Sequence, residues 1–235
     1  MKRRQSIPVQ AGKVTIGGSA PISIQTMSTV SPAHTAEAIA DAKRLASYGA
    51  EILRFAVPDM EAAKGLSAVV SAVDIPIVAD IHFDYRLALA AVDSGVQALR
   101  INPGNIAPMT TSSASLKKSA PRAFPSALAS IRGSLPADIL RPTAVTRRRR
   151  HGRRALRHIR ILERLDYRNM VISLKASDVP LMIESYQELA DKVPYALHLG
   201  VTEAGLVRDA ALSRPSVSEP YYTKHRRYDP RIPYG

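Results

Sequence analysis

Cysteine is absent from this chain of 235 residues. Its absence excludes disulfide bonds and any metal or iron–sulfur site held by cysteine thiolates of these residues. The sequence also lacks a run of about 18 apolar residues, the length that predicts a membrane span. Residues 1–8 are basic and then mixed, without the apolar core of a secretion signal. We therefore expect neither membrane insertion nor export, and predict a cytoplasmic protein.

Acidic residues are scarce in one part of the chain. The net charge is +13, and residues 107–154 carry eleven Lys and Arg against one Asp or Glu. The counts are ten against nine in residues 1–106, seven against seven in 155–208, and five against three in 209–235. Outside the basic segment the chain is nearly neutral, as expected of a metabolic enzyme domain.

The order of apolar runs and helical patterns predicts an α/β fold. With 46% hydrophobic residues, the chain is long enough for one barrel-sized domain. Four predicted strands alternate with three helices in the first 106 residues, and two further strands alternate with helices after residue 154. The six predicted strands span 21–27, 51–57, 76–82, 98–102, 170–175 and 195–201. This alternation indicates a parallel sheet with right-handed crossovers, as in a TIM (β/α)₈ barrel.

Several helix ends are marked in the sequence. Ser31 and Pro32 form a good start for a helix that ends before residue 49. Asp59 is predicted to cap a helix over residues 60–73, and Asp84 to cap the next one. Gly95 is expected to end that helix in the left-handed conformation.

Polar residues follow the predicted strands at their carboxyl ends, where barrel enzymes hold their active sites. Arginine there suits bidentate recognition of anionic oxygens and lysine gives a point charge, while Asp, Asn and His can form hydrogen bonds with hydroxyl groups. The alternative is that the charged side chains are solvated or form salt bridges, and that the polar ones cap loops and helices. The candidates are Arg54, Asp80, His82, Arg100, Asn102, Asn105, Lys175, Thr202 and Glu203. His198 lies inside a strand and is interpreted as a packed, hydrogen-bonded core residue.

Five ordered segments carry a family resemblance. They are VPDMEA at 57–62, ADIHFDYR at 79–86, LRINPGN at 99–105, KASDVP at 175–180 and LGVTEAG at 199–205. Together they closely resemble 4-hydroxy-3-methylbut-2-enyl diphosphate synthase, the iron–sulfur enzyme of the non-mevalonate isoprenoid pathway. The match covers residues 4–106 and 155–208.

The resemblance implies a fold, a reaction and partners. The family joins a TIM barrel, similar to that of dihydropteroate synthase, to a C-terminal domain whose cysteines hold a [4Fe–4S] cluster, and its subunits form a head-to-tail homodimer. It opens 2-C-methyl-D-erythritol 2,4-cyclodiphosphate reductively, with electrons from flavodoxin or ferredoxin, and releases water. This chain ends before such a domain, so we expect it to be inactive as written.

The resemblance also assigns roles to the strand-end residues. Glu203 and Asp80 are expected to be catalytic. The other seven are expected to bind substrate: Arg54, His82, Arg100, Asn102, Asn105, Lys175 and Thr202. No residue is expected to ligate a metal or a cluster.

Two segments do not fit the family pattern. We expect a partial barrel over residues 1–208, with an irregular basic insert at 107–154 in place of strand five, and an irregular tail at 209–235 in place of strand eight. When codons are re-read in a shifted frame, residues 122–131 and 225–235 can encode sequences resembling those strands. We therefore interpret the chain as frame-disrupted, although a parallel strand at 123–131 would count against this.

Two alternative functions remain from the residues alone. One is a basic nucleic-acid-associated protein on a barrel remnant, because a run such as Arg147 to Arg150 is typical of a phosphate-binding arm. A shifted frame in a GC-rich gene would produce the same run without selection. The other is a barrel that binds a phosphorylated or pterin-like ligand without a cluster.

Overall fold

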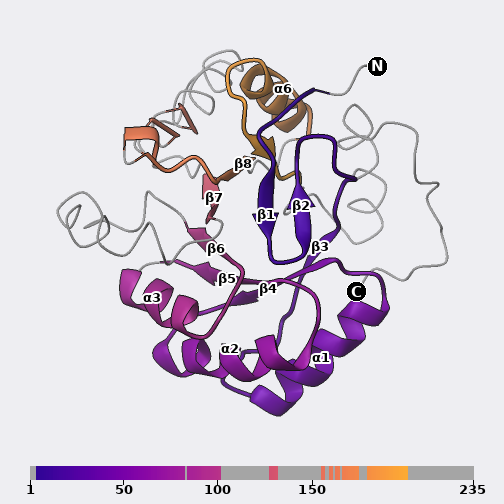
Figure 1. Cartoon of the computed structure of the whole chain (residues 1–235), viewed down its shortest axis with the longest axis vertical. Helices are drawn as coiled ribbons and strands as arrows, with labels where there is room; N and C mark the ends of the chain where they lie inside the picture. Colours follow the sequence, from indigo (N-terminus) through magenta and orange to yellow (C-terminus); the bar gives the residue numbers. More distant parts are fainter. Residues whose placement is uncertain are drawn as a thin grey trace.

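Seven parallel strands form one continuous sheet that curves around the molecule (Figure 1). The computed structural model describes residues 4–82, 84–101, 127–131, 155–156, 159–160, 162–164, 166–174 and 179–200. In spatial order the strands are β3 (Gln25–Met27), β4 (Ile52–Ala56), β5 (Ile77–Ile81), β6 (Ala98–Ile101), β7 (Ala127–Ile131), β8 (Val171–Leu174) and β9 (Ala196–Leu197). Spatial order equals chain order and every pair is parallel, which is the topology of a (β/α)₈ barrel.

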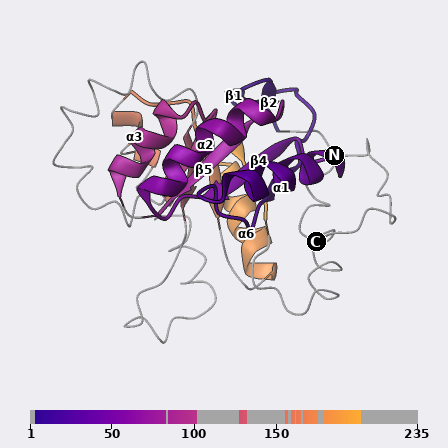
Figure 2. The ribbon, with the colours of Figure 1, turned by 90° about the horizontal axis from the view of Figure 1, so that it is seen from below.

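Helices cover the outside of the sheet. They are α1 (Thr35–Ser47), α2 (Met60–Ala72), α3 (Tyr85–Asp93) and α6 (Val179–Ala190). Figure 2 shows α1, α2 and α3 side by side on one flank, with α6 on another part of the wall. No helix in the described part of the chain is long and apolar enough to cross a membrane.

The predicted helix ends at two helices are confirmed. The Asp59 carboxylate accepts a hydrogen bond of 2.8 Å from the Ala62 amide at the start of α2. Asp84 accepts one of 2.9 Å from the Arg86 amide at the start of α3. Gly95, just beyond α3, has φ +85°, the left-handed conformation predicted for it.

The ends of some elements differ from the prediction. β3 begins at Gln25 rather than at residue 21, because Pro21 has no N–H and the Ile24 N–H donates to the Glu51 carboxylate at 2.8 Å. Likewise, α1 begins at Thr35, three residues after Pro32, since a turn closed by His34 N–H and Ser31 O precedes it.

A hairpin that the sequence pattern did not predict lies inside the ring of strands. It consists of β1 (Val9–Ala11) and β2 (Val14–Ile16), which pair antiparallel around a two-residue turn at Gly12 and Lys13. Gly12 has φ +54°, which glycine adopts at the first turn position without steric cost. Figure 1 shows the hairpin near the centre of the ring.

The hairpin packs against the amino-terminal ends of the strands from inside. Ala11 clusters with the first inward-facing residues of three strands, and Val9 does the same with two further strands. The strand residues in these clusters are Ile52, Val78, Ala98, Val171 and Ala196. This apolar layer closes one end of the barrel and leaves the carboxyl ends of the strands for the site.

The expectation that residues 107–154 contain no strand is wrong at five positions. β7 occupies the fifth place in the sheet, with Arg100 paired to Leu128 on one side and Ser130 to Ser173 on the other. A strand between two open edges gains main-chain hydrogen bonds from both, which depend little on side chains, and Ala-Leu-Ala-Ser-Ile can adopt extended structure. The strand covers five of the nine positions from 123 to 131, and the frame-disruption hypothesis stays a prediction. The rest of 107–154 and the tail 209–235 lie outside the described residues.

Candidate functional site

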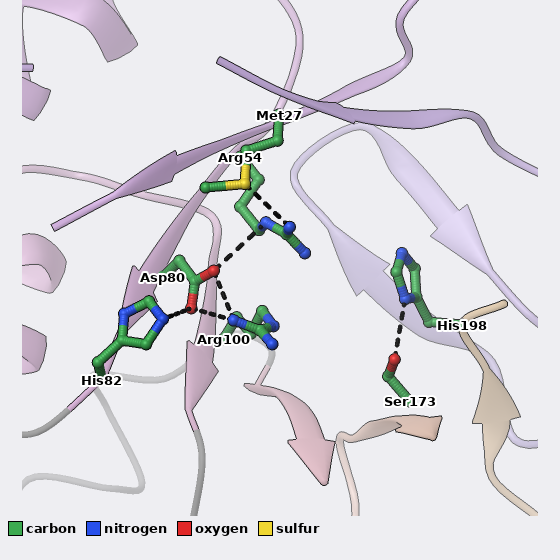
Figure 3. A network of polar contacts seen from close by, with 7 residues as sticks. All are labelled: Met27, Arg54, Asp80, His82, Arg100, Ser173 and His198. Atoms are coloured by element: carbon green, nitrogen blue, oxygen red, sulfur yellow. Dashed lines mark hydrogen bonds and ion pairs between the residues drawn. The ribbon is translucent and has the colours of Figure 1, made fainter. Parts of the chain in front are cut away.

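A polar layer lies directly above the apolar layer inside the barrel. In β4, β5 and β6, residues that pack against α1–α3 alternate with residues that face the interior, as the period of two requires. In β8 and the residues around β9 the same alternation separates the α6 side from the interior. The second inward-facing residues from the six strands with described side chains are Met27, Arg54, Asp80, Arg100, Ser173 and His198 (Figure 3).

Asp80 and Arg100 form the buried centre of this layer. They are register partners on β5 and β6, and Arg100 Nη1 donates to both carboxylate oxygens of Asp80 at 2.5 Å. The side chains are 2% and 8% exposed, respectively. A charge-assisted pair at this depth is fixed in position, because breaking it would leave a buried charge without a partner.

Arg54 brings a second guanidinium group to the same carboxylate. Its Nε lies 3.4 Å from Asp80 Oδ2, and its Nη2 donates to Met27 Sδ at 3.0 Å. Within the described residues, the buried Nε has no hydrogen-bond partner. Burial lowers the pKa of Arg54, Asp80 opposes this, and the neighbouring Arg100 charge lowers the pKa further. Arginine nevertheless keeps its charge in proteins, so the buried Arg54 side chain remains a cation.

His82 lies at the rim of the layer. Its Nε2 is 3.9 Å from Asp80 Oδ1, and its side chain is 43% exposed. His82 follows Asp80 by two residues and therefore faces the same way, one step nearer the carboxyl end of β5. The structure thus brings together four predicted site residues: Arg54, Asp80, His82 and Arg100.

Ser173 and His198 share this layer, although the sequence analysis did not select them. The Nδ1 atom of His198 lies 3.3 Å from the Ser173 hydroxyl oxygen. His198 faces the barrel interior and is partly buried (Figure 3), and with its contact to Ser173 the interpretation as a packed, hydrogen-bonded residue stays a prediction. The signal was its spacing, because His198 follows Ala196 by two residues and alternation therefore places both on one strand face.

The other five predicted site residues lie outside the described residues. They follow β6, β8 and the segment after β9 in the sequence. They are Asn102, Asn105, Lys175, Thr202 and Glu203.

The charges of the layer favour an anionic ligand. Among the described residues two buried guanidinium groups share one carboxylate, which leaves one of their positive charges without a paired anion in this part of the chain. In the described part of the chain no three His, Asp or Glu side chains are grouped to hold a metal ion. The 235 residues contain no cysteine, so they do not fit a thiolate-held iron–sulfur cluster.

Fold and site together define a parallel α/β barrel with a positively charged polar layer at the carboxyl ends of its strands. Solved structures that share the fold include 3-dehydroquinate dehydratase from Geobacillus kaustophilus, with a TM-score of 0.61 and 15% identity over 91% of this chain and 85% of that one. A dihydropteroate synthase from Coxiella burnetii has a TM-score of 0.56 and 14% identity over 78% and 74% of the two chains.

The sequence gives the family. The model of the GcpE TIM-barrel domain matches residues 6–216, and the chain belongs to this family. A relative from Dehalococcoides mccartyi is 47% identical over 213 residues, which are 88% of this chain and 61% of the relative. One from Clostridium tetani is 42% identical over 205 residues, 87% and 59% of the two chains. Both are named 4-hydroxy-3-methylbut-2-en-1-yl diphosphate synthase (flavodoxin). The chain therefore spans about three-fifths of the length of these relatives.

Proposed function

We propose that this barrel binds 2-C-methyl-D-erythritol 2,4-cyclodiphosphate, as the substrate-binding part of an oxidoreductase that forms 4-hydroxy-3-methylbut-2-enyl diphosphate in isoprenoid biosynthesis. The observation that carries the proposal is the pair of buried guanidinium groups around the single carboxylate of Asp80. Family membership and the names of the relatives support the choice of substrate.

Arg54 and Arg100 would bind the diphosphate. A planar guanidinium group can give two parallel hydrogen bonds to phosphate oxygens, and Arg54 Nε has no hydrogen bond to another described residue. Asp80 is 2% exposed, and Arg100 donates hydrogen bonds to both of its oxygens. Its role would therefore be to orient the two arginines and not to take part directly in catalysis. His82, at the rim, would contact the erythritol part of the ligand.

The remaining roles follow from the resemblance. Lys175 would add a point charge to the diphosphate after β8, and Asn102 and Asn105 would bond the ligand after β6. Thr202 and Glu203 would face the ring-opening centre, with Glu203 as the catalytic carboxylate.

The reductive step needs electrons from outside this chain. The relatives' names include flavodoxin, and we propose flavodoxin as the electron donor of the whole enzyme. A [4Fe–4S] cluster and a homodimer belong to the same proposal. Since these residues provide no thiolate, the barrel itself would contribute binding and orientation of the substrate only.

Calorimetric titration with the cyclic diphosphate tests the proposal. Arg54→Gln should weaken binding about tenfold to a hundredfold, because a hydrogen bond between charged groups contributes about 1.5–3 kcal/mol. Arg44→Gln is the matched control, since Arg44 pairs with Asp41 on the outer helix α1. The proposal would be contradicted if the Arg54→Gln variant bound the cyclic diphosphate as tightly as the wild type. It would also be contradicted if a DNA oligonucleotide bound as tightly as the cyclic diphosphate and displaced it.

A further inference from the structure

Met27 of β3 directs its sulfur at the guanidinium group of Arg54 (Figure 3). The two residues are register partners in the parallel pair of β3 and β4, so their side chains leave the sheet on the same face. Arg54 Nη2 donates to Met27 Sδ at 3.0 Å, and Arg54 Nε lies 3.4 Å from Asp80 Oδ2. The guanidinium group is thus oriented by a carboxylate at one nitrogen and by a thioether at another.

The thioether is the weaker of these two partners. Its sulfur is neutral and a weak hydrogen-bond acceptor, so it orients the guanidinium group without binding it strongly. A phosphate oxygen is a far stronger acceptor for an arginine N–H. The diphosphate of the proposed ligand can therefore replace the sulfur at Nη2.

Met27 is also accessible to oxidants. It is 39% exposed, whereas Met170 is fully buried in the core beneath α6. The 235 residues contain six methionines and no cysteine, so no thiol of these residues competes for a peroxide. Hydrogen peroxide transfers one oxygen atom to a thioether: the O–O bond breaks, an S–O bond forms, the sulfur loses two electrons, and water is released.

Oxidation would reverse the character of the contact with Arg54. The sulfoxide oxygen is a polar acceptor carried by a sulfur that lies 3.0 Å from Nη2, so it would bind the guanidinium group in place of a phosphate oxygen. The added oxygen also takes up space beside the cation.

We propose that Met27 is a site of reversible oxidation, whose sulfoxide holds Arg54 and lowers the affinity of the barrel for the diphosphate. The proposal deepens the proposed function and rests on it. Methionine sulfoxide reductases return the sulfoxide to the thioether and water with electrons from thiols, so the lost affinity is recoverable. Met27 is a positioning residue, because it acts on the ligand only through the orientation of Arg54.

Calorimetric titration of the full chain with 2-C-methyl-D-erythritol 2,4-cyclodiphosphate, before and after treatment with hydrogen peroxide, tests this. Peptide mass spectrometry should find an added oxygen atom on Met27. The treated wild type should bind about tenfold more weakly, as expected for the loss of one hydrogen bond between charged groups, and methionine sulfoxide reductase should restore its affinity. Met27→Leu should bind with the same affinity before and after treatment.

Met60→Leu is the matched control, because Met60 is 40% exposed at the start of α2. It should lose affinity on treatment as the wild type does. Unchanged affinity of a wild-type chain whose Met27 is fully oxidised would overturn the proposal, as would an equal loss of affinity in treated Met27→Leu. Absence of binding by the untreated wild type would instead overturn the proposed function, and this inference with it.

Discussion

At the scale of single residues, the site is organised by one carboxylate that two guanidinium groups share. Desolvation of charges costs several kcal/mol per ion, so such a cluster persists only when each member is paired or a ligand completes it. Asp80 pairs well with Arg100, at 2.5 Å, and less closely with Arg54, at 3.4 Å. The weaker contact leaves Arg54 as the cation with most capacity for a ligand.

Replacement of Asp80 by Asn should therefore destabilise the fold and not only the site. Removal of one partner of a buried ion pair costs about 3–5 kcal/mol, and here two arginines would lose their counter-charge. Urea unfolding should show a lower midpoint for Asp80→Asn. The control is Asp74→Asn, whose pair with Lys13 is fully open to solvent and should change the midpoint little. Equal midpoints would mean that Asp80 does not stabilise the arginine pair.

The sequence was sufficient to select Asp80, His82 and Arg100, because each lies at or near the end of a clear strand and the carboxyl ends of parallel strands converge. Arg54 was selected as well, although it is the middle residue of β4. It was insufficient for His198. Whether a strand histidine faces the core or the barrel interior depends on the phase of alternation, and a shift of one residue reverses it. Only the packing of Tyr195 and Leu197 against α6 fixed that phase.

At the scale of elements, the β1–β2 hairpin replaces the side-chain layer that usually fills the bottom of a barrel. Two of the five inward residues beneath the site are alanines, Ala98 and Ala196, and Ala11 and Val9 of the hairpin pack in the same clusters. The short alternation from Val9 to Ile16 was too brief to predict this placement from sequence. Its position in the ring follows from long-range packing.

Gly17→Ala should test this packing. Gly17 has φ +87°, and an added Cβ would lie 2.7 Å from Ser6 Oγ and 2.8 Å from Ala196 Cβ. Gly49→Ala is a matched control, since Gly49 has φ +93° but nothing within 4 Å of an added Cβ. Both variants should lose about 1–3 kcal/mol from backbone strain. Thermal unfolding should show a larger loss for Gly17→Ala, and equal losses would mean that the hairpin is not tightly packed on β9.

β7 shows where composition misleads. The Ser-, Ala- and Arg-rich texture of residues 107–154 predicted irregular structure, yet five of these residues complete the sheet between β6 and β8. Main-chain pairing on two sides outweighed the weak strand propensity of the segment.

The gene sequence decides whether the segment is also frame-disrupted. The hypothesis predicts that single-base insertions or deletions near codons 107, 132, 141, 154 and 209 restore the family pattern on both sides. Sequencing of the locus on both strands is the measurement. If no reading frame of the DNA at codons 122–131 encodes a family-like strand, the hypothesis is wrong and β7 is the native fifth strand.

At the scale of the whole molecule, the described sheet has seven strands and ends at β3 and β9. Three of the exposed large apolar side chains lie on or next to β3: Ile22, Ile24 and Met27, at 37%, 45% and 39% exposure. A strand that is at the edge of the described sheet and flanked by exposed apolar side chains is a site for pairing with further chain.

The lack of cysteine has a direct consequence for the chain as written. Iron–sulfur reconstitution should give no stable cluster and no broad visible absorbance, because each cluster iron needs a thiolate or equivalent ligand. Absorption spectra after desalting provide the measurement. A cluster that survives desalting would show that other side chains of these residues can ligate iron.

The central claim is that the polar layer of this barrel holds a diphosphate between Arg54 and Arg100. A crystal structure of the chain with 2-C-methyl-D-erythritol 2,4-cyclodiphosphate tests it most directly. The diphosphate should lie at the carboxyl ends of the strands, with phosphate oxygens about 2.7–2.9 Å from guanidinium nitrogens of both arginines. A ligand bound elsewhere, with Arg54 and Arg100 still contacting only Asp80 and Met27, would contradict it.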